Sequence, residues 1–414
     1  MSRYKRTNEN KVDVSEGINY SAVHFIRCHS KNNDPTDVKT QIWGVMFEPH
    51  PDDNNKTTHH VATCGGDSVT VIDVNSGIVE IKYKDKDTNE QFFTLAWTTL
   101  TVDDKKINVL ATGGIQGEIK MIHPQNKVCY HTWRAVNSKK TAVYSLVFHS
   151  NQPTWLFSGS SDGLVTLWDV GTPILPSYDR VHPKIIMKLS PNFGSVYNIA
   201  WSGHESNWLL AGTEDGLVGW NMEAVKVKQQ GRKYCPIMVD FLLPKKHNDG
   251  YDVDSIAVVG EWTIVAKCIK HGLLYVWDLK NTTLNLKRDA ENNQTVLEKE
   301  VKMVSTLKYL ETDNYFMNIG CHKGAGLIVC GDDQGALWLY DTQTLGQTFP
   351  KSLGSVVDPS TLLLWPEVQD DNLEENVNLL QNDEIIIDKV ATSHDSRYIV
   401  AVTNINLVCI WRKI

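Results

Sequence analysis

The sequence lacks paired cysteines, long apolar runs and a secretory signal. Its eight cysteines are scattered and form no CxxC pair, so the spacing of a zinc site or a redox motif is missing. We therefore expect free thiols in a reducing compartment, without a metal or cofactor. No stretch approaches the roughly 20 apolar residues of a membrane span, and the polar start MSRYKRTNENK has no apolar segment. These absences predict an intracellular soluble protein that does not contact membranes.

Catalytic motifs are missing as well. The sequence has no GxSxG elbow, no HExxH motif and no GxxxxGK[ST] phosphate loop, so we expect no enzymatic activity. The formal net charge of −8 at pH 7 disfavours binding to DNA through its phosphates and suits a basic partner. We expect no direct sequence-specific contact with nucleic acid.

A repeated strand ending dominates what is present. Seven short apolar segments end in Trp-Asp or a related pair: VTVID (69–73), IKMIH (119–123), VTLWD (165–169), LVGWN (217–221), LYVWD (274–278), LWLYD (337–341) and VCIWR (408–412). Successive endings lie 46 to 71 residues apart, which is typical of WD repeats, where each repeat forms a four-stranded blade. We predict an all-β, seven-bladed WD-repeat propeller over residues 21–414.

The two ends of the chain are expected to meet in the last blade. The alternating segment AVHFIRC (22–28) has no blade before it, so we predict that it closes the ring against VCIW near the C-terminus. Residues 1–20 are polar and predict a disordered tail or linker. Insertions at 280–300 and 367–384 are predicted to be mobile. The second holds seven acidic residues and no Lys or Arg, which predicts a solvated loop or an attraction for a basic tail.

The position before the first strand of each repeat is aromatic or acidic throughout. In register, these residues are Trp43, Phe93, Tyr144, Tyr197, Asp254, Tyr315 and Asp388. The pseudo-rotation axis of a propeller relates them, so we expect them to surround one mouth of the central channel. Grouped surface aromatics mark a binding site, and ring faces attract methylated ammonium groups. The alternative is that the rings pack between blades, which we favour for Tyr144 and Tyr197.

Several segments resemble the WD-repeat half of the leucine-rich repeat and WD repeat-containing family, which associates with the origin recognition complex. They are HFIRCHSKNNDPTDVKTQIW (24–43), ATCGGDSVTVID (62–73), QFFTLAW (91–97) and GLIVCGDDQGALWLYD (326–341). The leucine-rich repeats expected upstream are not in the sequence, which predicts a propeller-only member or a fragment. More distantly, the chain resembles the Polycomb propeller called embryonic ectoderm development, whose aromatic cage binds trimethyl-lysine on repressive histone tails.

The Polycomb resemblance implies which residues form a cage. That cage uses the pre-strand positions of blades one, two and six, which hold Trp43, Phe93 and Tyr315 here, with Phe316 adjacent. The remaining pre-strand positions, Asp254, Asp388, Tyr144 and Tyr197, are expected to form an acidic and aromatic rim around the same mouth. Asp254 matches an acidic residue of the relative, whereas Asp388 replaces a basic one. We expect Trp43→Ala or Tyr315→Ala to abolish methyl-peptide binding without unfolding the protein.

These observations predict a non-enzymatic chromatin reader and scaffold in the nucleus. It would bind trimethyl-lysine on histone tails and recruit the origin recognition complex to heterochromatin. One alternative is a Polycomb-type scaffold of a histone methyltransferase, which would co-purify with a SET-domain enzyme. Another is a substrate receptor of a ubiquitin ligase. Such receptors often carry Arg two residues after Trp-Asp, whereas Gly171 follows Asp169 and Lys280 follows Asp278 at that spacing, which disfavours this alternative.

Overall fold

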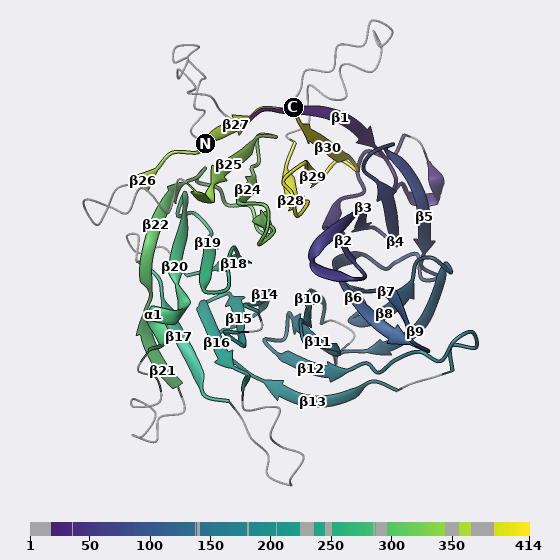
Figure 1. Ribbon diagram of the computed structural model, residues 1–414, viewed down its shortest axis with the longest axis horizontal. Coiled ribbons are helices and arrows are strands. Elements are labelled where there is room, and N and C mark those ends of the chain that lie inside the picture. Colours follow the sequence, from purple (N-terminus) through teal and green to yellow (C-terminus); the bar gives the residue numbers. More distant parts are fainter. Residues whose placement is uncertain are drawn as a thin grey trace, which may run out of the picture.

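Seven sheets form a ring around a central axis (Figure 1). The computed structural model describes residues 18–34, 36–136, 138, 141–179, 182–203, 205–223, 236–244, 251–284, 286, 296–343, 356–365 and 385–414. In each sheet, the first strand of the repeat lies nearest the axis and the last on the perimeter (Figure 1). The prediction of an all-β, seven-bladed propeller is confirmed.

The blades follow one another along the chain. Blade one holds β2 (Ile42–His50), β3 (Asp53–Gly65), β4 (Ser68–Asp73) and β5 (Ile78–Lys84). Blade two holds β6 (Phe92–Val102), β7 (Lys105–Gly114), β8 (Glu118–His123) and β9 (Val128–Arg134). Blade three holds β10 (Val143–His149), β11 (Gln152–Ser160), β12 (Val165–Asp169) and β13 (Lys184–Leu189). Blade four holds β14 (Val196–Trp201), β15 (Trp208–Thr213), β16 (Gly216–Asn221), β17 (Met238–Leu242) and β21 (Val296–Glu300).

The remaining blades complete the ring. Blade five holds β18 (Val253–Val258), β19 (Thr263–Cys268), β20 (Leu273–Asp278), β22 (Lys302–Lys308) and β26 (Val356–Val357). Blade six holds β23 (Gly320–Cys321), β24 (Leu327–Gly331), β25 (Leu337–Asp341) and β27 (Thr361–Leu363). Blade seven holds β28 (Ile387–Thr392), β29 (Tyr398–Thr403), β30 (Val408–Lys413) and β1 (Tyr20–Ile26). Short helices include η1 (Lys31–Asn33) and α1 (Leu279–Thr283).

The N-terminal strand closes the ring as predicted. β1 pairs antiparallel with β30, with Tyr20 opposite Lys413 and Ile26 opposite Val408, so the strand lies two residues earlier than the segment 22–28. The insertion predicted to be mobile at 280–300 is folded at both ends, because it contributes most of α1 and all of β21, which pairs in parallel with β17. The insertion 367–384 and residues 1–17 of the predicted tail lie outside the described residues.

The inner strands are buried on both faces because each blade packs against two others, whereas perimeter strands such as β5 and β13 are partly exposed. All six residues of β15, WLLAGT, are buried. Between blades four and five, Leu210, Phe241 and Trp277 are each at most 1% exposed and belong to one apolar cluster. Truncation of such a side chain to Ala typically costs about 3–5 kcal/mol. No helix among the described residues is long and apolar enough to span a membrane.

A belt of hydrogen bonds near the axis joins neighbouring blades. In each bond, a backbone N–H in one blade donates to a side chain of the preceding blade: Leu146 to Thr94 Oγ1 (3.2 Å), Ile199 to Ser145 Oγ (3.0 Å), Ile256 to Asn198 Oδ1 (2.9 Å) and Ile319 to Ser255 Oγ (2.9 Å). In blades three to five, the donor comes two residues after the pre-strand position. The belt therefore assigns that position in blade six to Met317, and the predicted register at Tyr315 is two residues off.

Candidate functional site

A β-bulge sets the direction of the pre-strand side chain in the first four blades. The register skips Trp43, Phe93, Tyr144 and Tyr197, one in each blade. A bulged residue leaves the alternation of its strand, so its side chain is re-aimed. The residues just before these four are buried in the core, whereas the four aromatic rings are only half-buried.

The rings meet at one mouth of the channel. The centroid distances along the arc are 5.6 Å for Trp43–Phe93, 5.9 Å for Phe93–Tyr144, 6.4 Å for Tyr144–Tyr197 and 5.5 Å for Tyr197–Tyr315. Three of these four contacts join neighbouring blades one to four, and the fourth reaches across from blade four to the segment before blade six. The structure thus brings together every aromatic residue predicted for the cage and rim.

Phe316 occupies the middle of this group. Its ring lies 5.9 Å from Trp43, 5.2 Å from Tyr144, 5.6 Å from Tyr197 and 6.4 Å from Tyr315. Its backbone has φ of +67°, which a bulky residue rarely adopts. The Phe316 N–H donates to Asp254 Oδ2 at 2.9 Å, which holds the backbone in this conformation.

Four of the rings form a closed circuit. Trp43, Phe93, Tyr144 and Phe316 contact one another in sequence, and Trp43 stands nearly perpendicular to both Phe93 (85°) and Phe316 (87°). The centroid distances around the circuit are 5.2 to 5.9 Å, and a ring face attracts a cation within roughly 6 Å of its centroid. We call this circuit the four-ring box.

Tyr315 lies outside the four-ring box. It contacts Tyr197 and Phe316, and its hydroxyl donates to Asp252 Oδ2 at 2.6 Å. This hydrogen bond, together with desolvation and the Asp252 charge, raises the pKa of Tyr315 to about 12. Phe316, and not Tyr315, is therefore the blade-six ring that faces Trp43.

The two predicted rim carboxylates are buried. Asp254 is 0% exposed and pairs with Lys267 Nζ at 2.8 Å, and Asp388 is 1% exposed and accepts from Gln41 Nε2 at 2.8 Å. Burial raises the pKa of both carboxyl groups, with Lys267 opposing the shift at Asp254. Because both carboxylates are buried, they form no part of the exposed rim, which corrects the prediction for both residues.

Other carboxylates take the rim position. Glu214 is exposed and Asp252 is partly exposed. Burial raises the pKa of Tyr197 well above its ordinary value, and the charges of Glu214 and Asp252 add to the shift. Sequence reasoning missed both carboxylates. Asp252 lies only two residues before Asp254, and Glu214 opens the turn Glu214-Asp215-Gly216 after β15. These positions in the sequence could have indicated that both carboxylates lie near the mouth.

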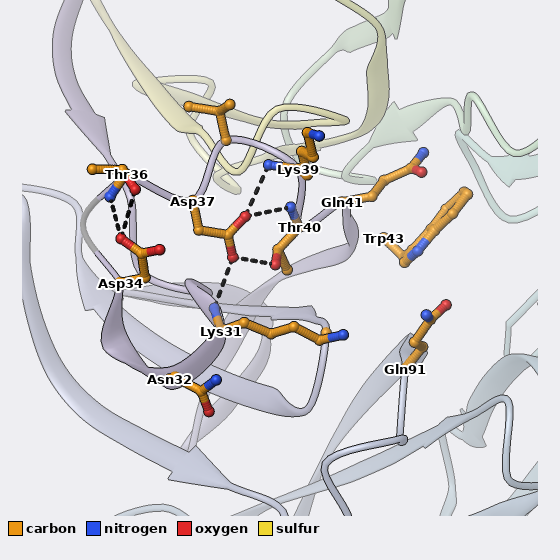
Figure 2. A pocket seen from close by; sticks show the side chains of 12 residues that line it. Lys31, Asn32, Asp34, Thr36, Asp37, Lys39, Thr40, Gln41, Trp43 and Gln91 are labelled. Carbon is orange, nitrogen blue, oxygen red and sulfur yellow. Dashed lines mark hydrogen bonds between the residues drawn. The ribbon is translucent and has the colours of Figure 1, made fainter.

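A hollow of about 700 Å³ opens beside the box. One wall is formed by residues 31, 32, 34 and 36–41, and Gly66, Gln91 and Trp43 complete the lining (Figure 2). Trp43 therefore belongs both to the box and to the hollow.

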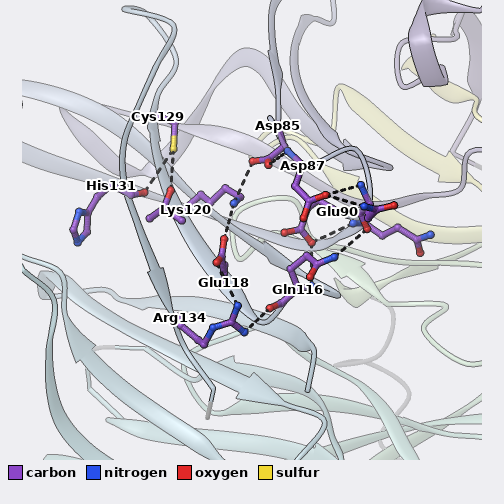
Figure 3. Close-up of polar contacts among 12 residues, drawn as sticks. Asp85, Asp87, Glu90, Gln116, Glu118, Lys120, Cys129, His131 and Arg134 are labelled. Carbon is purple, nitrogen blue, oxygen red and sulfur yellow. Dashed lines mark hydrogen bonds and ion pairs between the residues drawn. The ribbon is translucent and has the colours of Figure 1, made fainter. Parts of the chain in front are cut away.

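A buried polar network supports the segment that carries Phe93 (Figure 3). Lys120 is 5% exposed, and its Nζ lies 3.2 Å from Asp85 Oδ2 and 3.1 Å from Glu118 Oε2. Glu90 Oε1 accepts from the N–H groups of Gln91 (3.1 Å) and Gln116 (3.3 Å), which fixes the approach to β6. Within the described ranges, no group of three or more His, Cys, Asp or Glu side chains is arranged to hold a metal ion.

Comparisons with known proteins agree with this architecture. The family model described as "Leucine-rich repeat and WD repeat-containing protein 1, WD domain" matches residues 14–414. Proteins of that name from Xenopus laevis and Homo sapiens are 33% and 30% identical, over 95% and 96% of this chain and 53% and 58% of their own length. The chain thus spans about half of the curated relatives it matches.

The Polycomb likeness is more distant. The Polycomb group protein FIE1 of Zea mays is 22% identical over 63% of this chain and 54% of its own length. A chain in the structure of a humanized mutant of the Chaetomium thermophilum Polycomb Repressive Complex 2, bound to the inhibitor GSK126, superposes with a TM-score of 0.69 at 11% identity. That superposition covers 95% of this chain and 97% of the other. On the family match, the chain belongs to the WD-domain family of leucine-rich repeat and WD repeat-containing protein 1.

Proposed function

We propose that the propeller is a non-enzymatic reader of methylated lysine on histone tails and acts in the nucleus as a chromatin scaffold. The observation that carries the proposal is the four-ring box at an open end of the channel. A desolvated ring–cation contact contributes about 0.5–2 kcal/mol, so three or four rings around one methylammonium supply much of the roughly −8 kcal/mol of a micromolar complex.

The charge around the mouth supports the same ligand. Glu214 and Asp252 lie close enough to Tyr197 to raise the pKa of its hydroxyl. Carboxylates beside a cation site raise the local concentration of a basic tail and speed its association. Because a trimethylated nitrogen has no N–H to donate, the rings and not the carboxylates would distinguish it from unmodified lysine.

A titration with matched histone peptides tests the proposal. The wild-type protein should bind a trimethyl-lysine peptide at least about tenfold more tightly than the unmodified peptide, and Trp43→Ala should remove that difference. Trp262→Ala is the control, because Trp262 is also half-buried but precedes β19 at the opposite end of its hairpin from the mouth. Equal affinity of the wild-type protein for both peptides would contradict the proposal.

We further propose that the rest of the propeller recruits the origin recognition complex to heterochromatin. This step is supported by membership of the family and by the wide surface that the ring of blades offers around the mouth. Affinity purification from nuclear extract should recover origin-complex subunits with the wild type and with Trp43→Ala. Recovery of a SET-domain methyltransferase in their place would favour a Polycomb-type scaffold.

A further inference from the structure

The hollow beside Trp43 has a wall that is fixed before any ligand arrives. Asp37 Oδ2 accepts from the Lys31 N–H (2.7 Å) and the Thr40 hydroxyl (2.5 Å), and its Oδ1 accepts from the N–H groups of Lys39 (2.9 Å) and Thr40 (3.1 Å). Asn406, in the turn between β29 and β30, donates from Nδ2 to the Asp37 backbone carbonyl at 2.8 Å. The segment is therefore anchored to blade seven.

Both carboxylates of this wall accept hydrogen bonds from their own loop. Asp34 Oδ1 accepts from the N–H and the hydroxyl of Thr36, at 2.8 and 2.7 Å, and these bonds lower the pKa of Asp34. Burial acts to raise the pKa of Asp37, but its hydrogen bonds, first that from the Thr40 hydroxyl, lower it overall. Both groups stay ionised and turn toward their own loop (Figure 2).

Lys31 is the group that faces the open space. Figure 2 shows its side chain extending into the hollow between Trp43 and Gln91, away from Asp37. Lys31 and Lys39 are both exposed, and neither has an ion pair among the described residues. The hollow thus offers the Lys31 ammonium to a ligand, while both oxygens of Asp37 and Oδ1 of Asp34 accept hydrogen bonds from their own loop.

The two sides of the aromatic group therefore differ in charge. Glu214 and Asp252 lie beside Tyr197, and Lys31 lies on the side of Trp43. An extended peptide rises about 3.3 Å per residue, so a residue one to three positions from a lysine held in the box reaches the hollow. A peptide with an anionic group on the side of Trp43 would place that group near Lys31 while its methylated lysine lies in the box.

We propose that the hollow is a second subsite for an anionic group, a phosphate or a carboxylate, carried by the same peptide within about three residues of the methylated lysine. This inference rests on the proposed function, because the lysine in the box places the peptide. Lys31 Nζ supplies a charge-assisted hydrogen bond, and Gln91 lines the same hollow. The second charge of a phosphate makes it the stronger ligand of the two.

Titration with a paired set of peptides tests this subsite. Trimethyl-lysine peptides with phosphoserine, glutamate or serine at each flanking position are compared at about 50 and 200 mM salt. The best phosphoserine peptide should bind about three- to tenfold more tightly than its serine counterpart, and the gain should shrink at the higher salt. Lys31→Gln should abolish the gain and Lys31→Glu should reverse it. Lys184→Gln, an exposed lysine on the perimeter strand β13, should leave the gain intact.

The outcomes separate the two proposals. A protein that prefers trimethyl-lysine but treats phosphoserine, glutamate and serine alike at every position would overturn the subsite and leave the box in place. A phosphate gain that persists in Lys31→Gln would also overturn it. Equal binding of methylated and unmethylated peptides would instead remove the proposed function.

Discussion

Phe316 donates its backbone N–H to Asp254 Oδ2 at 2.9 Å while its φ is +67°. The left-handed conformation costs an ordinary residue about 1–2 kcal/mol, and a hydrogen bond to a charged acceptor offsets a cost of that size. The result is a ring turned out of the core toward Trp43, with Met317 taking the buried place beneath it, where it is 0% exposed. The blade-six wall of the box thus depends on a backbone contact to blade five.

The strain at Phe316 is measurable by substitution. Phe316→Gly and Phe316→Ala both lose the ring, but only Gly adopts positive φ without a steric cost. We expect Phe316→Gly to be about 1 kcal/mol more stable than Phe316→Ala in urea unfolding. Tyr144, which sits at a bulge but does not have a positive φ, is the control, and there Gly should be less stable than Ala. If the Gly variant at 316 is no more stable than the Ala variant, Phe316 is not strained.

The Asp254–Lys267 pair carries a second prediction. Both side chains are at most 1% exposed, so Asp254→Asn leaves a buried ammonium without its counter-charge. We expect a loss of about 3–5 kcal/mol in the free energy of unfolding. Asp358→Asn breaks the Lys308–Asp358 pair, which has a similar 3.0 Å distance but 60% and 74% exposed side chains, and should cost at most about 1 kcal/mol. Similar losses at the two sites would refute the role of burial.

The positions of Phe316 and Tyr315 predict unequal effects on binding. Phe316 is a wall of the four-ring box, whereas Tyr315 contacts the box from outside through Phe316. We expect Phe316→Ala to weaken trimethyl-lysine binding about tenfold or more, Tyr315→Ala by about two- to fivefold, and Tyr315→Phe hardly at all. Calorimetric titration gives the order. A larger loss in Tyr315→Ala than in Phe316→Ala would mean that the ligand sits between Tyr315 and Tyr197.

Much of this site follows from the sequence, because strand endings fix the register of regular blades. That register correctly groups Trp43, Phe93, Tyr144 and Tyr197, whose strands each carry the same bulge. The register fails for blade six, because β23 has only two residues and the left-handed turn at Phe316 alters the spacing before this strand.

Burial of the two acidic pre-strand residues depends on partners that the repeat pattern does not identify. Gln41 lies 347 residues from Asp388, and Lys267 belongs to the next strand after Asp254. The periodicity of the sequence predicts whether such a side chain faces inward or outward, but it does not predict which group neutralises the charge of the carboxylate. Where a carboxylate occupies a pre-strand position that is aromatic in other blades, the sequence alone therefore predicts that it is exposed.

His29 couples the stability of the fold to pH. It is 0% exposed, and its ring nitrogens lie 2.8 Å from Ser68 Oγ and 2.8 Å from Thr63 Oγ1. Burial, with a smaller contribution from Lys82, lowers the pKa of His29 to about 3. The unfolded chain therefore takes up a proton near pH 6.5 that the folded chain does not, and stability falls as the pH falls below about 6.5. At pH 5 this loss is about 2 kcal/mol.

Comparison of two histidine variants isolates this effect. The free energy of unfolding, measured in urea at several pH values, should fall less steeply from pH 8 to pH 5 in His29→Gln than in the wild type. His60 is the opposite case, because hydrogen bonding to Glu48 and the nearby carboxylates raise its pKa. Its contribution is complete below about pH 6.5 and disappears as the pH rises through the folded value, so His60→Gln should approach wild-type stability only at alkaline pH. A His29→Gln protein as acid-sensitive as the wild type would show that His29 is not the group that titrates on unfolding.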